Sequence, residues 1–277
     1  MTAALLLALG ASLAWGVADF VGPLWGRAFG ALRIMLWAQA AGVAALVLVL
    51  AVRAEPPRSA ETLLAIPAAL AGTLGLYAYY RGMAVGAMTV IAPIAGVSAI
   101  VPVAFGIATG DRPSVPQFAG MACAIVGVGT ASLERSTGSR RIAAGAGLAL
   151  LAALGFGFYF PAMHAAANSD FLWASLIFRT TALGVVAVAA GVRRPELRLP
   201  RRHLAIAAAV GLGDTLGNVL YAASSAERGL VSLTSVLASL YPVVTVLLAA
   251  RILREHVAPA QRAGIVLTLA GVLLIGV

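Results

Sequence analysis

Apolar residues in this chain gather into ten long runs separated by short polar breaks. A helix that crosses the hydrocarbon core of a bilayer needs roughly 20 apolar residues, because each residue adds about 1.5 Å along the helix axis. The runs have about this length and cover residues 3–23, 32–52, 62–82, 89–108, 116–133, 142–163, 172–191, 204–224, 232–250 and 259–276. The pattern predicts an all-α integral membrane protein with ten transmembrane helices.

The composition supports the same fold class. Hydrophobic residues make up 61% and charged residues 10% of the 277 positions, whereas a soluble domain needs far more charge to cover its surface. The polar breaks are too short to hold an extramembrane domain. The first residues, Met1-Thr2-Ala3, lack the basic segment of a secretory signal, so we expect the first run to be a retained helix.

The charges predict an orientation in the membrane. The net charge is +9, and all 19 basic residues are arginine, in a composition typical of a GC-rich bacterial genome. We therefore expect a multi-pass protein of the bacterial plasma (inner) membrane. The breaks on the side of the termini hold four arginines and the opposite breaks hold twelve. Because arginine favours the cytoplasmic side and anionic headgroups, we expect non-cytoplasmic termini and contact with the lipid bilayer, not with nucleic acid.

The chain also contains an internal repeat. Residues 111–128 and 255–272 match at a spacing of 144, including Gly120 with Gly264, and Tyr77 lies the same distance before Tyr221. Five runs fall in residues 1–136 and five in residues 141–277, which we take as two repeats. Because five is odd, the second copy must enter the bilayer from the opposite side. This arrangement predicts an inverted-topology repeat with a substrate site near the midplane between the halves. Two fused halves allow a complete carrier as a monomer.

Several short motifs resemble a known superfamily. They are Trp15-Gly16, Arg33, Ala92-Pro93, Gly110-Asp111-Arg112-Pro113, Ser239-Leu240-Tyr241-Pro242-Val243 and Leu253-Arg254-Glu255. In order and spacing they resemble the drug/metabolite transporter superfamily, specifically its ten-helix EamA-type members. The resemblance implies a secondary carrier of small metabolites, amino acids or drug-like compounds that works by alternating access, in either direction. It also implies a cavity lined by spans 1, 3, 4, 6, 8 and 9, with spans 5 and 10 joining the halves.

Asp214 is the sharpest candidate for a functional residue. A charged group inside a bilayer is costly, so it marks a substrate or proton site unless a partner explains it. Asp214 lies near the centre of the run 204–224, and Asn218 and Tyr221 follow on the same helical face. This face is suited to binding an amine or taking up a coupling proton. The alternative is a structural ion pair with Arg179, which lies at a similar depth in the neighbouring run.

Asp19 is the second acidic candidate. It shares a helical face with Trp15, about four residues from the end of the first run. Arg81 ends the third run, which crosses in the same direction, so an Asp19–Arg81 pair is geometrically feasible. Such a pair predicts a structural or gating contact, and the other interpretation is a coupling role for Asp19.

Aromatic residues form two further stripes. Aromatic side chains suit cavity walls because they combine apolar area with a polar handle, but they also form interface belts and plain packing. The two stripes lie in the third and sixth runs and contain Tyr77, Tyr80, Phe156, Tyr159, Phe160 and His164.

Three prolines fall inside the fourth and ninth runs. Pro93, Pro102 and Pro242 each remove a backbone donor and bend a helix, so they are candidate hinges or static kinks. Ser98, Ser239 and Tyr241 lie near these positions. Their hydroxyls are candidates for substrate contact or for bonding back to their own helix.

Other functions find less support in the sequence. The three histidines are far apart, so we expect no metal site. A chain without lysine cannot contain a phosphate-binding G-x-x-x-x-G-K-[ST] loop, and we expect no cofactor. A membrane enzyme acting on lipid-linked substrates needs acids or histidines clustered at one interface, and a channel needs charged rings or a filter loop. The small-molecule carrier is the favoured hypothesis, and the alternatives are a membrane enzyme, a channel or a non-transporting scaffold.

Overall fold

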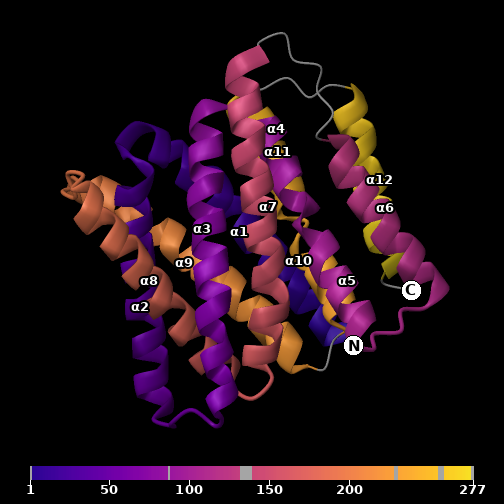
Figure 1. Ribbon diagram of the computed structural model, residues 1–277, viewed down its shortest axis with the longest axis horizontal. Helices are drawn as coiled ribbons and strands as arrows, with labels where there is room; N and C mark the ends of the chain where they lie inside the picture. The colour runs from indigo at the N-terminus through magenta and orange to yellow at the C-terminus, as the bar shows by residue number, and fades with distance from the viewer. Residues whose placement is uncertain (1, 87, 132–138, 228–229, 255–258, 276–277) are drawn as a thin grey trace.

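The structure, a computed structural model, describes residues 2–86, 88–131, 139–227, 230–254 and 259–275. These residues are almost entirely helical and include no β-strand (Figure 1). The elements are α1 (Thr2–Phe29), α2 (Ala31–Arg53), η1 (Ala60–Leu64), α3 (Ala65–Val85), α4 (Met88–Gly96), η2 (Val97–Ala99), α5 (Ile100–Thr109), α6 (Val115–Ala131), α7 (Ser139–Ala167), α8 (Phe171–Arg193), α9 (Arg201–Ala226), α10 (Val231–Ala238), α11 (Tyr241–Ile252) and α12 (Pro259–Ile275).

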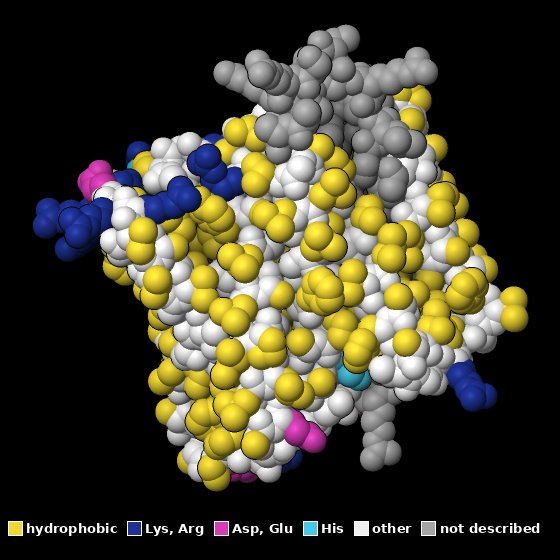
Figure 2. All heavy atoms as spheres, in the orientation of Figure 1, with side chains coloured by type: hydrophobic (Ala, Val, Ile, Leu, Met, Phe, Trp, Pro, Cys, Tyr) yellow, Lys and Arg dark blue, Asp and Glu magenta, His cyan; other side chains and the backbone are white. Residues whose placement is uncertain are grey.

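The helices occupy the ten ranges that hydropathy predicts. Within the described residues, seven helical segments are long and apolar enough to cross a membrane, and shorter apolar helices accompany them. Large apolar side chains also cover the outer surface of the bundle, with Val52 at 81% and Val192 at 78% exposure. In Figure 2 apolar side chains spread over the middle of the face, whereas arginines gather at its edges. Such a surface is stable against lipid tails and not in water.

Polar residues in the connections fix where the helices begin and end. Asp170 caps α8, because its Oδ1 accepts a hydrogen bond from the Trp173 backbone N–H at 3.3 Å. Gly110 ends α5 with a φ of 113°, a backbone conformation that glycine adopts without steric cost.

Two predicted spans are broken at their centres. The fourth consists of α4, η2 and α5, and the ninth consists of α10 and α11. Pro102 and Pro242 each follow a break, because neither ring nitrogen can donate the helical hydrogen bond to the residue four positions earlier. Pro93 lies within α4, which continues to Gly96.

The two halves of the chain contain the same succession of helices, but their spacing is not constant. Both ends of α2 and α8 are 140 positions apart, both ends of the segment Ala60–Val85 and of α9 are 141 apart, and both ends of α6 and α12 are 144 apart. Each connection in the second half is one or two residues longer. The match of Tyr77 with Tyr221 at a spacing of 144 is therefore wrong. Tyr80 is the residue equivalent to Tyr221.

Contacts between the halves come in reciprocal pairs. α3 packs on α7 as α1 packs on α9, and α2 contacts α9 as α8 contacts α3. The equivalent helices α6 and α12 pack on each other at one side of the bundle (Figure 1). Glycines permit these close approaches: a Cβ on Gly155 of α7 would lie 2.6 Å from the Ala71 carbonyl oxygen of α3, and one on Gly127 of α6 would lie 2.6 Å from the Thr268 nitrogen of α12.

Candidate functional site

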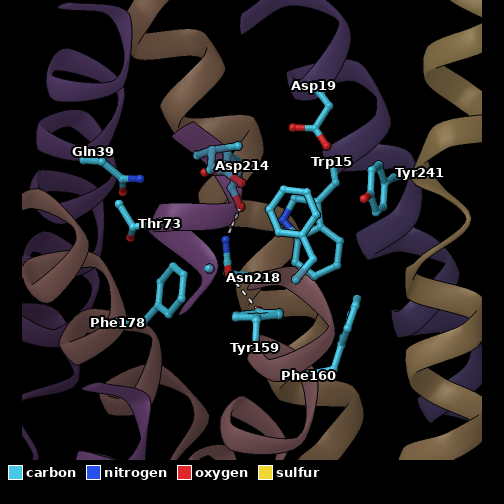
Figure 3. Close-up of a pocket in the computed structure, with 13 residues that line it drawn as sticks. Trp15, Asp19, Gln39, Thr73, Tyr159, Phe160, Phe178, Asp214, Asn218 and Tyr241 are labelled. Atoms are coloured by element: carbon cyan, nitrogen blue, oxygen red, sulfur yellow. Dashed lines mark hydrogen bonds between the residues drawn. The ribbon is translucent and has the colours of Figure 1, made fainter. Parts of the chain in front are cut away.

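A cavity lies where the two halves meet (Figure 3). Its walls come from α1, α2 and α3 of the first half and from α7, α8, α9 and α11 of the second. The described residues that line it are Trp15, Asp19, Gln39, Gly72, Thr73, Leu76, Phe156, Tyr159, Phe160, Phe178, Asp214, Asn218 and Tyr241. Aromatic faces and a few polar groups thus share one space, as in a site for a small molecule.

On one wall of the cavity, Asp214 forms an ion pair. Arg179 Nη1 lies 2.7 Å from Asp214 Oδ2 and donates a second hydrogen bond, at 2.8 Å, to Gln39 Oε1. Arg179 is fully buried, and its Nε and Nη2 have no partner in the described part of the chain. The contact that the sequence offered as a structural alternative is therefore present, and it neutralises the charge of Asp214.

Further hydrogen bonds connect Asn218 with the Asp214 backbone and with Tyr159. Asn218 Nδ2 donates to the Asp214 carbonyl oxygen at 2.8 Å, and the Tyr159 hydroxyl donates to Asn218 Oδ1 at 2.7 Å. Asn218 and Tyr159 are both buried. A chain of polar contacts therefore connects α7, α9, α8 and α2 along this wall.

Asp19 lines the cavity without such support. Its exposure is 6%, and it forms no ion pair or hydrogen bond with any residue that the structure describes. The expected pair with Arg81 is absent, because Arg81 is exposed while the preceding residue, Tyr80, points inward against Gly22 of α1. Neighbours on a helix differ by about 100° in direction, so both side chains cannot face α1.

Aromatic rings close the cavity between α1, α7 and α9. The ring centroids of Trp15 and Tyr159 lie 5.9 Å apart, and those of Trp15 and Phe160 lie 6.0 Å apart, both in edge-to-face contact. Tyr221 packs behind this layer, where its hydroxyl donates to the Phe160 carbonyl oxygen at 3.0 Å and lies 2.8 Å from Ser235 Oγ. These contacts pack the rings into a continuous wall.

The structure brings together seven of the predicted site residues in the lining: Trp15, Asp19, Phe156, Tyr159, Asp214, Asn218 and Tyr241. Five others lie outside it: Tyr77, Tyr80, Ser98, Tyr221 and Ser239. Tyr77 lies under the Arg193 guanidinium, 5.9 Å from its ring centroid, and Ser239 Oγ donates to the Val236 carbonyl oxygen of its own helix at 2.9 Å. The sequence left open whether the Ser239 hydroxyl contacts substrate or bonds back to its own helix, and the structure shows the second.

Gln39 and Phe178 line the cavity but were missed at the sequence level. Gln39 is an amide inside a predicted span, and the rule that selected Asp214 also applies to it. The corrected spacing supplies a second signal, because Gln39 is equivalent to Arg179 and Thr73 is equivalent to Asp214. The hydrogen bond between Arg179 and Gln39 therefore joins equivalent positions of the two halves.

The described residues contain no group of three or more His, Cys, Asp or Glu side chains that could hold a metal ion. His164 is half-buried, and its Nδ1 has no partner among these residues. It lies outside the cavity lining.

Ion pairs outside the membrane connect the halves at both ends of the bundle. Arg53, at the end of α2, contacts Asp170 at 2.8 Å and Glu55 at 2.7 Å. Burial raises the pKa of Asp170, but the hydrogen bonds from Arg53 and from the Trp173 backbone N–H outweigh it, so the pKa is lowered. At the other end, Arg33 of α2 contacts the Glu196 carboxylate at 3.1 Å.

An all-helical apolar bundle with a polar, aromatic cavity between two similar halves is the architecture of a multi-pass membrane transporter. The chain belongs to the EamA-like transporter family, whose sequence model matches residues 2–133 and 143–277. Members of this family are transporters of small solutes, and the family lies within the drug/metabolite transporter superfamily.

The fold is also similar to solved structures. One of them, described only as the crystal structure of a protein, superposes with a TM-score of 0.73 over 99% of this chain and 96% of the other. The two sequences are 17% identical, so this likeness concerns the fold alone. No curated protein matches the sequence.

Proposed function

We propose that this protein is a secondary carrier that moves a small metabolite or drug-like compound across the bacterial inner membrane by alternating access. The observation that carries the proposal is the cavity itself, which places charged and aromatic side chains from both halves deep within an apolar bundle. Buried polar groups are costly in a membrane protein and are retained where a solute binds. We place the substrate in this cavity.

The two halves would act as inverted repeats, residues 1–136 and 141–277. The reciprocal contacts of α3 with α7 and of α1 with α9 support this arrangement, since a two-fold axis in the membrane plane generates such pairs. Ten crossings would return the chain to the side on which it began. The surplus of arginines on the opposite side favours non-cytoplasmic termini.

The broken helices are the proposed moving parts. Pro102 and Pro242 cannot donate the helical hydrogen bonds to the residues four positions earlier, so the breaks before them resist bending less than continuous helices do. α10 and α11 contact α1, whose Trp15 and Asp19 line the cavity. Bending at the breaks would therefore change the cavity. Pro93, within α4, is a third candidate hinge.

If transport is coupled to protons, Asp19 suits that role better than Asp214. Protonation of Asp214 breaks its ion pair with Arg179, whereas Asp19 has no cationic partner in the described part of the chain. The groups that face Asp19 from the neighbouring helices are Tyr79, Tyr80, Asp214 and Tyr241, with Arg179 behind Asp214. A proton gradient that drives uptake equally well in wild type and Asp19→Asn would contradict this assignment.

Transport can be tested with the full-length protein in liposomes. We expect saturable uptake of a solute and exchange of labelled for unlabelled solute across the bilayer, neither of which occurs in empty liposomes. Uptake that rises linearly with concentration would indicate a channel. Binding without any uptake would indicate a membrane enzyme or a non-transporting scaffold.

A further inference from the structure

We propose that the cavity binds a small organic ammonium ion, with the Asp19 carboxylate as its counter-ion and Trp15 and Tyr241 as aromatic neighbours. The inference rests on the proposed function, because it takes this cavity to be the transport site. It adds the charge class of the solute, which family membership does not supply.

The charges that line the cavity favour an ammonium ion. Among the described residues, the lining contains two carboxylates, Asp19 and Asp214, and Arg179 lies directly behind it. Arg179 and Asp214 neutralise each other through their 2.7 Å contact. When Asp19 is ionised, its carboxylate is the charge of the described lining that no neighbouring side chain compensates. A buried charge without a partner is costly, and a bound cation removes that cost.

Three tyrosine side chains lie near Asp19, and one of them, Tyr241, lines the cavity with it. The side chains of Tyr79, Tyr80 and Tyr241 lie close enough to interact electrostatically with the Asp19 carboxylate. The Tyr241 hydroxyl is buried in the lining beside Ser98, and its oxygen can accept a hydrogen bond from an ammonium N–H. Pro23, four positions after Asp19, has no backbone N–H and cannot donate the helical hydrogen bond to the Asp19 backbone carbonyl. The carbonyl oxygen of Asp19 is therefore more open to a hydrogen bond from a solute.

The adjacent rings supply the second element of an ammonium site. In Figure 3 the Asp19 carboxylate points toward the space that Trp15, Tyr241 and Asp214 border. The face of an aromatic ring attracts a cation, most strongly for tryptophan and more strongly away from water. Trp15 is 7% exposed and Tyr241 is 3% exposed, so a cation beside them is shielded from solvent.

An anionic or zwitterionic solute fits the cavity less well. Its carboxylate would need a free positive charge at the wall, and Arg179 is fully buried behind Asp214 and Gln39 rather than in the lining. Gln39 and Thr73, on the opposite side from Asp19, are neutral. The apolar walls at Phe156, Phe160 and Phe178 instead accommodate a hydrocarbon or aromatic group attached to the ammonium.

Four probes with one phenyl group and different charges test the inference. They are 2-phenylethylamine (a cation), 2-phenylethanol (neutral), phenylalanine (a zwitterion) and 3-phenylpropionate (an anion), each titrated at pH 7 into the purified full-length protein by calorimetry. We expect the amine to bind about tenfold or more tightly than each of the others. Equal or tighter binding of phenylalanine or 3-phenylpropionate, or no binding of the amine, would overturn the proposal.

Two variants locate the site. Asp19→Asn removes the charge while keeping the shape, and we expect it to weaken amine binding about tenfold or more while leaving 2-phenylethanol binding unchanged. The unchanged alcohol shows that the cavity is still folded. Glu61→Gln, the same chemical change at an exposed site outside the cavity, should leave amine binding as in wild type. Unaltered amine affinity in Asp19→Asn would overturn the proposal.

The outcomes separate this inference from the proposed function. Saturable transport of a neutral or anionic solute, unaffected by Asp19→Asn, keeps the carrier and rejects the ammonium site. Asp19-dependent binding of the amine, with no uptake of amine into liposomes, keeps the site and rejects the carrier.

Discussion

Asp19 and Asp214 line the same cavity, yet their surroundings are opposite. Asp214 contacts Arg179, which compensates its charge, and Asn218 donates to its backbone carbonyl while accepting from Tyr159. Asp19 is more deeply buried and lacks a cationic partner among the described residues. The comparison teaches that burial of an acid does not by itself identify a binding group. The acid without a partner is the one whose charge a bound solute can compensate.

The largest effect is expected from breaking the Arg179–Asp214 pair on one side. Arg179→Leu leaves the Asp214 carboxylate unpaired in the interior, which should lower the unfolding free energy by about 3–5 kcal/mol, measured by reversible unfolding in mixed micelles. The double change Arg179→Leu/Asp214→Leu should recover most of the loss, because it removes both charges. A double variant as unstable as the single one would mean that the pair is not the cause.

A smaller effect is expected from loosening the support of Asp214. Tyr159→Phe removes the hydroxyl that donates to Asn218 and should cost about 1 kcal/mol in the same unfolding measurement. Tyr77→Phe is a matched control, since Tyr77 lies outside the cavity lining and contacts Arg193 through its ring. Equal losses in both variants would show that the Tyr159–Asn218 bond contributes nothing specific.

The Arg53–Asp170 pair extends the comparison to an acid outside the membrane. Its partners lower the pKa of Asp170 below the value of about 3.9 expected for the unfolded chain. The stabilisation is therefore complete above that value and is lost as the pH falls through the lowered pKa. Asp170→Asn should cost less stability at pH 7 than Tyr159→Phe, because Arg53 reaches solvent and an asparagine oxygen can still accept from Arg53 and from the Trp173 backbone N–H.

Unfolding of wild type and Asp170→Asn at several pH values checks this expectation. The difference in stability should be constant between pH 7 and about pH 5 and should shrink below about pH 4. A difference that grows on acidification would contradict the lowered pKa.

The smallest effect on stability is expected at Asp19. Asp19→Asn removes no ion pair seen in the described structure, so it should lower the unfolding free energy by less than about 1 kcal/mol, and loss of an unpaired buried charge acts in the opposite direction. The same variant should lose amine binding. A large loss of stability would reveal a structural partner for Asp19 and would remove its contrast with Asp214.

Much of the fold followed from hydropathy, and less of the site did. The ten helical ranges, the breaks near Pro102 and Pro242 and the Arg179–Asp214 contact were all accessible from the sequence. Tyr77 and Tyr221 were misaligned because the connections of the second half are one or two residues longer, and a constant spacing cannot reveal this. Gln39 was overlooked although it, like Asp214, is a polar residue inside a predicted span.

The sequence by itself determined that this chain forms an apolar helical bundle with two similar halves, because hydrocarbon thickness and the cost of buried charge act on every residue locally. Only the tertiary structure decided which buried acid has a partner. The directions of neighbouring side chains, the packing of Tyr80 against Gly22 and the position of Arg179 between α2 and α9 separate Asp19 from Arg81 and join Asp214 to Arg179. Charge compensation depends on distances between helices, and these distances are set only when the helices pack.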